Sequence, residues 1–272
     1  MHTWTWQTWQ GKPYLTCDVL TDWDHGFFTH QFAPETPETI VQALSQAHVS
    51  VVPVYRTKQV HGNVVLSPSE IEAATKALVS AIDGAETLER PHADGSHSEQ
   101  AAQAVWVCTA DCTPALIGDV RTGQVAAVHA GWRGTAQKIV PVAIERLQAQ
   151  GSRLEDLRVA LGPAIDGEVY QVNVAVAAEV GASVFEAKAF DDAVAFVDFL
   201  KGLDQPPVLE DAEPDKVRLD VRRMNVLQLE QLGMVAEQIA IAPHCTYQEP
   251  EKFFSYRRTG KKQVQWSGIV SR

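Results

Sequence analysis

Three short segments of the chain carry the residues most able to do chemistry. They are Lys-Gln-Val-His-Gly at 58–62, Cys-Thr-Ala-Asp-Cys at 108–112 and His-Ala-Gly-Trp-Arg-Gly at 129–134. In them His61, Cys112 and His129 offer two imidazole nitrogens and one sulfur. Three protein ligands with a free fourth position are typical of a catalytic zinc site, whereas a structural zinc normally takes four. Cysteine with two histidines also suits copper, so these segments predict a zinc site with copper as the alternative.

Other interpretations of the same residues stay open. A buried cysteine often packs as a small hydrophobe, and histidines often sit hydrogen-bonded in a core. Cys108 is the natural rival of Cys112, but it falls within a predicted strand, and a Cys-x₃-Cys pair lacks the Cys-x-x-Cys redox spacing. Asp111 could hold a ligating histidine in one tautomer, act as a general base, or serve only as a turn residue.

Cations near these segments predict a pocket for an anion. Arg133 stands between Gly131 and Gly134 at a predicted helix start, where glycine lets the backbone approach a ligand and the helix N-terminus attracts negative charge. Its planar guanidinium suits phosphate. Further cations beside apolar segments are Lys58, Arg257 and Arg258.

The elements that must position these groups are predicted from local patterns. Cys112 and His129 follow apolar runs at 104–108 and 124–128, and His61 follows a β-branched run at 49–55. If the first two strands are neighbours, their ligands emerge at one edge of a sheet, where catalytic groups collect on loops. Two helices are expected over 68–82 and from Thr135 to about Gln150. The segments 253–257 and 264–270 are expected to close the chain as a hairpin.

Strands and helices are intermixed without strict alternation. That pattern favours a mixed-sheet α+β or mixed α/β fold, with a β-sheet core flanked by helices, and we expect a single domain over residues 1–272. No Gly-x-Gly-x-x-Gly or Walker segment is present, so no nucleotide cradle of either type is indicated.

Composition excludes several classes of function. The chain has 272 residues, a net charge of −11 and a pI of about 5.3. An acidic chain is a poor general nucleic-acid binder. No apolar stretch is long enough to span a membrane, and no signal peptide is evident. The four cysteines, Cys17, Cys108, Cys112 and Cys245, are scattered as in reduced cytoplasmic proteins, so we expect a cytoplasmic protein.

With these residues in hand, the chain resembles the YfiH-like family, whose members are called laccase-domain or polyphenol oxidase proteins and also purine nucleoside phosphorylases. The matching strings are KQVHG (58–62), HADG (92–95), TADCTP (109–114), HAGWRG (129–134), LGPAI (161–165) with Tyr170-Gln-Val172, and CT…FFSYRR (245–258). The resemblance implies a fold like that of cytotoxic necrotizing factor. It also implies zinc ligation by His61, Cys112 and His129.

The implied activity is zinc-dependent phosphorolysis of adenosine, inosine, guanosine and methylthioadenosine, with deamination of adenosine. We expect Asp111, Cys112 and Arg133 in catalysis, and Lys58, Arg133 and Arg257 on the substrate phosphate; protein partners stay unknown. A copper polyphenol oxidase is the first alternative, but a multicopper oxidase needs many His-x-His pairs, and the 9 histidines here form none. A hydrolase with Cys112 as nucleophile is the second.

Overall fold

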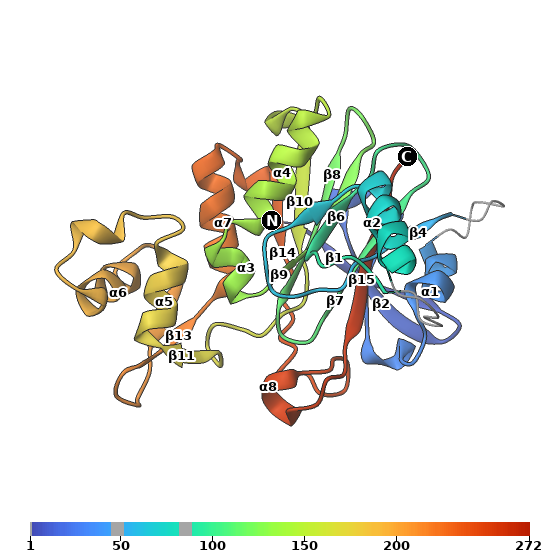
Figure 1. Ribbon diagram of the computed structural model, residues 1–272. Coiled ribbons are helices and arrows are strands. Elements are labelled where there is room, and N and C mark those ends of the chain that lie inside the picture. Colours follow the sequence, from blue (N-terminus) through green and yellow to red (C-terminus); the bar gives the residue numbers. More distant parts are fainter. Residues whose placement is uncertain (1, 45–51, 82–88) are drawn as a thin grey trace.

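Two six-stranded β-sheets packed face to face form the centre of the molecule, and helices cover their outer faces (Figure 1). The computed structural model describes residues 2–44, 52–81 and 89–272. A small third sheet with two helices projects as a lobe on one side (Figure 1). The expected mixed α/β fold with mixed sheets and flanking helices is confirmed.

The first sheet combines the N-terminal strands with the last strand of the chain. Its order is β1 (Trp4–Trp9), β2 (Lys12–Cys17), β3 (His25–Phe28), β15 (Gln265–Val270), β7 (Ala104–Thr109) and β4 (Val54–Tyr55). The β4–β7 pair is parallel and the other pairs are antiparallel. The C-terminal strand therefore lies inside the sheet and joins elements that are far apart in sequence.

The second sheet carries most of the strands that matter for chemistry. Its order is β14 (Ile239–Ile241), β10 (Leu157–Leu161), β8 (Thr113–Asp119), β9 (Val125–Ala130), β6 (Gly95–His97) and β5 (Val65–Leu66). The pairs at its two edges, β10–β14 and β5–β6, are parallel, and the inner pairs are antiparallel. Every residue of β8 and β9 is buried, because the sheet is covered on both faces.

Alternate side chains of the second sheet serve two different cores. Leu116 and Ala127 face the first sheet and pack with Phe27 and Val107. The intervening residues face the other way and pack on α4 (Ile139–Ala149) and α7 (Val221–Leu232). On the far side, α1 (Pro37–Leu44) covers the first sheet. The result is a layered sandwich that holds the strand ends rigidly.

The remaining helices lie around this sandwich and in the lobe. The helix α2 (Pro68–Ala81) matches the helix expected over 68–82, whose last residue lies outside the described residues. The lobe consists of β11 (Gln171–Asn173), β13 (Lys216–Leu219) and β12 (Val208–Glu210) with α5 (Val174–Gly181) and α6 (Ala193–Lys201), around an apolar core of its own. Two short helices, α3 (Trp132–Ala136) and α8 (Tyr256–Thr259), complete the set within the described ranges.

The helix expected from Thr135 to about Gln150 is two helices in the structure. Lys138 takes a left-handed conformation (φ +60°) between α3 and α4, which interrupts the helical hydrogen bonds. Pro141 falls in the first turn of α4, where a missing N–H costs little. Thr135 does not cap a helix; its hydroxyl oxygen accepts a hydrogen bond from Asn225 instead.

The expected C-terminal hairpin is wrong. Ser255 caps the N-terminus of α8 by accepting a hydrogen bond from the Arg258 backbone N–H, and Gly260 ends the helix with a positive φ of 67°. The segment after it, β15, pairs with β3 and β7 rather than folding back on residues 253–257. Long-range pairing overrode the local signal.

No helix in residues 2–44, 52–81 or 89–272 is both long and apolar enough to cross a membrane.

Close packing at Gly268 gives a test of the fold. Gly268 of β15 lies opposite Trp106 of β7, and a Cβ there would come within 2.3 Å of the buried indole ring. We expect Gly268→Ala to lower the free energy of unfolding by about 1–3 kcal/mol, because the core must shift to admit the methyl group. Gly202→Ala is the control, since its Cβ would meet no atom nearer than 3.5 Å. Urea unfolding measures both, and equal midpoints would contradict this account of the packing.

Candidate active site

The three predicted ligands meet at one end of the inner strands β8 and β9 of the second sheet. His129 lies in β9, Cys112 directly precedes β8, and the β8–β9 hairpin pairs Pro114 with His129. His61 comes from the loop between β4 and β5. The expected neighbouring strands, 104–108 and 124–128, belong to different sheets, so it is β8 that brings Cys112 beside His129.

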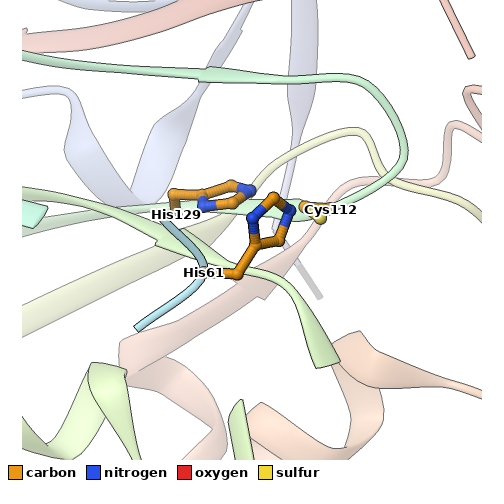
Figure 2. Close-up of side chains that lie close together, drawn as sticks. All are labelled: His61, Cys112 and His129. Atoms are coloured by element: carbon orange, nitrogen blue, oxygen red, sulfur yellow. The ribbon is translucent and has the colours of Figure 1, made fainter. Parts of the chain in front are cut away.

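The side chains of these three residues gather closely enough to share a metal ion. Their ligand atoms all lie within 4.8 Å of one another, and Figure 2 shows both imidazole rings next to the Cys112 thiol. The two rings stand edge to face, with centroids 4.9 Å apart. Gly131 makes room for the Cys112 side chain, because a Cβ at residue 131 would lie 2.7 Å from the Cys112 sulfur.

Asp94 organises this cluster, a role that its place in the HADG string did not reveal. Its fully buried carboxylate accepts hydrogen bonds from the backbone N–H groups of Val60, His61 and Gly62, at 2.8–3.2 Å. It also accepts one from Nδ1 of His129 at 2.8 Å. One carboxylate thus holds the His61 loop and fixes the His129 tautomer, which leaves Nε2 of His129 for a ligand.

The hydrogen bonds to Asp94 also set its charge. Burial would raise the pKa of this carboxyl, but hydrogen bonds from His129 and from the Gly62 and Val60 amides outweigh burial and hold the pKa below its usual value. Three successive amides point at it because His61 adopts a left-handed conformation (φ +63°). This is a rare conformation for a residue with a Cβ, and the Asp94 contacts maintain it.

Cys112 and His129 shift each other's ionisation. Burial opposes a charged thiol, yet the His129 charge and hydrogen bonds from both histidines lower the pKa of Cys112 to about 6. Burial likewise opposes a charged imidazole, but the Cys112 thiolate and Asp94 raise the pKa of His129. Cys108 differs, because burial raises its pKa to about 11. The thiolate, which is the form that binds metal, is therefore stabilised at Cys112 and not at its rival.

The donor set fits a catalytic zinc ion. It offers two imidazoles and one thiolate. Of the two imidazoles, His61 is exposed to solvent and His129 is buried. Among residues 2–44, 52–81 and 89–272 this is the one group of three or more such side chains placed to share an ion. A fourth position open to solvent suits a catalytic rather than a structural site.

Asp111 lies beside the cluster but does not orient either histidine. Its carboxylate accepts hydrogen bonds from the Thr246 hydroxyl and from the Arg257 backbone N–H, both at 2.7 Å. The tautomer-fixing role considered for Asp111 therefore falls to Asp94. Asp111 instead attaches the C-terminal segment to the residue next to Cys112, and its φ of +91° shows that the turn is tightly constrained.

Tyr170 is electrostatically coupled to several of the candidate residues. Burial raises the pKa of its hydroxyl to about 12. The charges of Cys112 and Asp111 add to this effect, and those of Arg257 and Arg133 oppose it. In the sequence, Tyr170 stood out only as part of the matching string Tyr170-Gln-Val172, and no role was expected for it.

The two arginines are held by aromatic rings. The Arg257 guanidinium lies over the Tyr170 ring, 4.7 Å from its centroid, and donates to the Gln171 carbonyl at 2.9 Å. The Arg133 guanidinium lies 4.3 Å from the Trp132 ring centroid. Both residues are exposed, so each retains donors for a ligand.

The other two expected cations are placed differently. Lys58 is exposed three residues before His61, and none of the described contacts engages its amine. Arg258 is structural, because it donates to the carbonyls of Thr246, Tyr247 and Phe253. Of the four expected cations, Arg133 and Arg257 are therefore the exposed pair held over aromatic rings.

Removing the charge of Asp94 tests its organising role. In Asp94→Asn one oxygen becomes an NH₂ group that faces backbone donors. We expect about 1–3 kcal/mol loss of stability and about 10–100-fold weaker zinc binding. Since the pKa of Asp94 is depressed, its contribution is present above the unfolded value of about 4 and is lost as the pH falls through the folded value. The variant's stability should therefore depend less on pH in this acid range.

Asp119→Asn is the matched control, because Asp119 is equally buried and accepts the Arg121 and Thr122 amides of a turn. It should lose stability but keep its zinc. Urea unfolding and metal analysis after dialysis measure both variants, and normal zinc affinity in Asp94→Asn would contradict the assignment.

Comparisons with known proteins place the chain in a family. The family model described as multi-copper polyphenol oxidoreductase laccase matches residues 34–271. A Synechocystis protein named purine nucleoside phosphorylase is 53% identical over 268 residues, which cover 98% of this chain and 97% of that one. An adenosine deaminase from an unidentified prokaryote is 33% identical over 57% of this chain and 53% of its own length.

The fold recurs in the crystal structure of the Bacillus licheniformis protein YfiH, with a TM-score of 0.72 over 98% of this chain and 99% of that one, at 21% identity. From the extent of the family match and the near full-length relative, the chain belongs to the YfiH-like family described as multi-copper polyphenol oxidoreductase laccase.

Proposed function

We propose that the chain is a zinc-dependent purine nucleoside phosphorylase that also deaminates adenosine. The observation that carries the proposal is the cluster of His61, Cys112 and His129, organised by Asp94, beside two exposed arginines. The Synechocystis relative, named a purine nucleoside phosphorylase, supports the first activity, and the relative named an adenosine deaminase supports the second. The substrates we propose are adenosine, inosine, guanosine and methylthioadenosine.

In phosphorolysis, a phosphate oxygen attacks C1′ of the ribose. A C1′–O bond forms, the C1′–N9 bond breaks, and the purine leaves with the bonding electron pair and takes up a proton. Arg133 and Arg257 would bind the phosphate and neutralise its charge, and Lys58 is a further candidate at the exposed rim. Guanidinium groups bind phosphate through paired hydrogen bonds, which orient the attacking oxygen as well as holding it.

In deamination, a water oxygen attacks C6 of adenine. A C6–O bond forms, the C6–N bond breaks, and ammonia leaves after gaining a proton. A zinc ion bound by the cluster would supply Lewis-acid activation of water. Asp111 is our candidate for the proton transfer; each of its oxygens accepts one hydrogen bond in the structure, which leaves a lone pair on each.

A copper oxidase and a cysteine hydrolase are the two alternative functions for the same cluster. The family description favours a copper oxidase of phenols, and the donor set accepts copper, but the described residues hold a single three-ligand cluster. A hydrolase with Cys112 as nucleophile draws support from its lowered pKa. A free thiolate would be alkylated by iodoacetamide in the purified protein, whereas a metal-bound sulfur is protected until chelation.

We further propose a cytoplasmic protein, since thiolate ligation needs reduced cysteine.

Metal content and activity test the proposed function together. Purified protein should carry about one zinc per chain. Cys112→Ala and His129→Ala should lose both the zinc and the cleavage of inosine, because each removes one of three ligands. Cys108→Ala is the control and should keep both. The measurements are elemental analysis and chromatography of a nucleoside panel with and without phosphate. Full zinc in Cys112→Ala, or no nucleoside turnover by the wild type, would count against the proposal.

Substitution of Arg133 tests the phosphate site. A charge-assisted contact contributes roughly 1.5–3 kcal/mol, so Arg133→Ala should weaken phosphorolysis about tenfold to a hundredfold. Zinc content should not change, and deamination, which uses no phosphate, should suffer less. Arg133→Lys should recover part of the activity, because an ammonium lacks the bidentate fork.

Arg153→Ala serves as the control for Arg133→Ala, since the Arg153 side chain is 66% exposed and its one ion pair, at 3.9 Å, is long. Steady-state kinetics at varied phosphate concentration measure the phosphate dependence of both variants. Unchanged phosphate dependence in Arg133→Ala would place the pocket elsewhere, and loss of zinc would make Arg133 structural.

A further inference from the structure

Tyr170 is fixed at the junction between the lobe and the sandwich. Its carbonyl accepts a hydrogen bond from the Leu219 N–H of β13 at 3.0 Å, and its side chain packs against the apolar core of the lobe. The residue precedes β11 directly. The lobe therefore holds both the backbone and the base of the ring.

The C-terminal segment holds the other side of the ring. The Arg257 guanidinium covers the Tyr170 ring and donates to the carbonyl of the next residue, Gln171. The backbone of Arg257 is in turn bonded to Asp111, which adjoins Cys112. A continuous chain of contacts thus runs from the metal cluster to the phenol, and it crosses three segments that are distant in sequence.

The hydroxyl of Tyr170 keeps a free donor in this arrangement. The side chain is half-buried, none of the described hydrogen bonds engages the hydroxyl, and the hydroxyl is not among the buried polar atoms left unpaired. Its O–H is therefore open to a ligand. The Arg257 guanidinium lies over the Tyr170 ring, and Trp132, whose ring carries the Arg133 guanidinium, packs against the same lobe core as Tyr170. An anion placed between two such cations would find the phenol as a third donor.

We propose that Tyr170 determines specificity for phosphate, by donating a hydrogen bond from its hydroxyl to the phosphate that Arg133 and Arg257 bind. This inference rests on the proposed phosphorolysis. The hydrogen bond would favour phosphate over water as the group that attacks C1′, because water at that place could not engage all three donors. Deamination, which attacks the base at C6, does not use the contact.

Tyr170→Phe is the direct test, since it removes one oxygen and keeps the ring under Arg257. In zinc-loaded enzyme we expect the KM for phosphate to rise about tenfold to a hundredfold, the range for a hydrogen bond to a charged group. Deamination of adenosine without phosphate should stay within about twofold. Zinc content should equal that of the wild type. The control is Tyr55→Phe, whose hydroxyl donates to Glu72 of α2 instead, and it should leave the phosphate KM unchanged.

The outcomes separate this inference from the function on which it rests. If the wild type cleaves no nucleoside with phosphate, the proposed function fails and this inference with it. If the wild type depends on phosphate and Tyr170→Phe keeps the same KM, the inference alone is overturned. An equal loss of phosphorolysis and deamination in Tyr170→Phe would also overturn it, because that pattern belongs to a structural residue.

Discussion

The site depends on one buried carboxylate. Asp94 collects three backbone amides of the His61 loop and the ring of His129, so it joins two segments that approach each other only in the folded chain. A buried charge is costly unless it is fully hydrogen-bonded, and here the four donors supply that compensation. Because the same carboxylate holds the loop and the ring, neither ligand can shift without leaving a charge unsatisfied. The two imidazoles are therefore held in place by the protein itself.

The layered sandwich supplies the rigidity that this arrangement needs. The strands β8 and β9 are buried on both faces, between the first sheet on one side and α4 and α7 on the other. Close packing leaves such strands little freedom, so the ends that carry Cys112 and His129 are fixed relative to each other. At this end of β8 and β9 the loops add further groups, and they can vary without disturbing the core.

A second set of contacts brings the lobe and the C-terminal segment to the same place. Asp111 binds the Arg257 backbone, and the Arg257 guanidinium covers Tyr170 of the lobe. Arg257 is thereby held against the residue next to Cys112, in a chain whose net charge is −11. Local concentration of positive charge is what lets an acidic protein bind an anionic substrate. In our proposal, phosphorolysis and deamination share the metal cluster, and phosphorolysis alone uses these cations.

Much of the local structure could be predicted because its signals span only a few residues. Apolar runs indicated β7 and β9, and the pattern at 68–82 indicated α2. The choice of His61, Cys112 and His129 followed from ligand types and a family resemblance, and these are the three side chains that the structure brings together. The hairpin signal was less reliable, since Ser255 starts a helix where a strand was expected.

What the sequence by itself determined was the kind of chemistry: two imidazoles and a thiolate are metal donors wherever they lie. Tertiary structure alone decided that Asp94, and not Asp111, orients His129, because a carboxylate acts on whatever donors folding brings to it. It also decided that β15 lies between β3 and β7 and that Arg257 meets Tyr170. Pairings of this kind join residues far apart in the chain. Their geometry depends on how every intervening element packs, and no local pattern of residues encodes that.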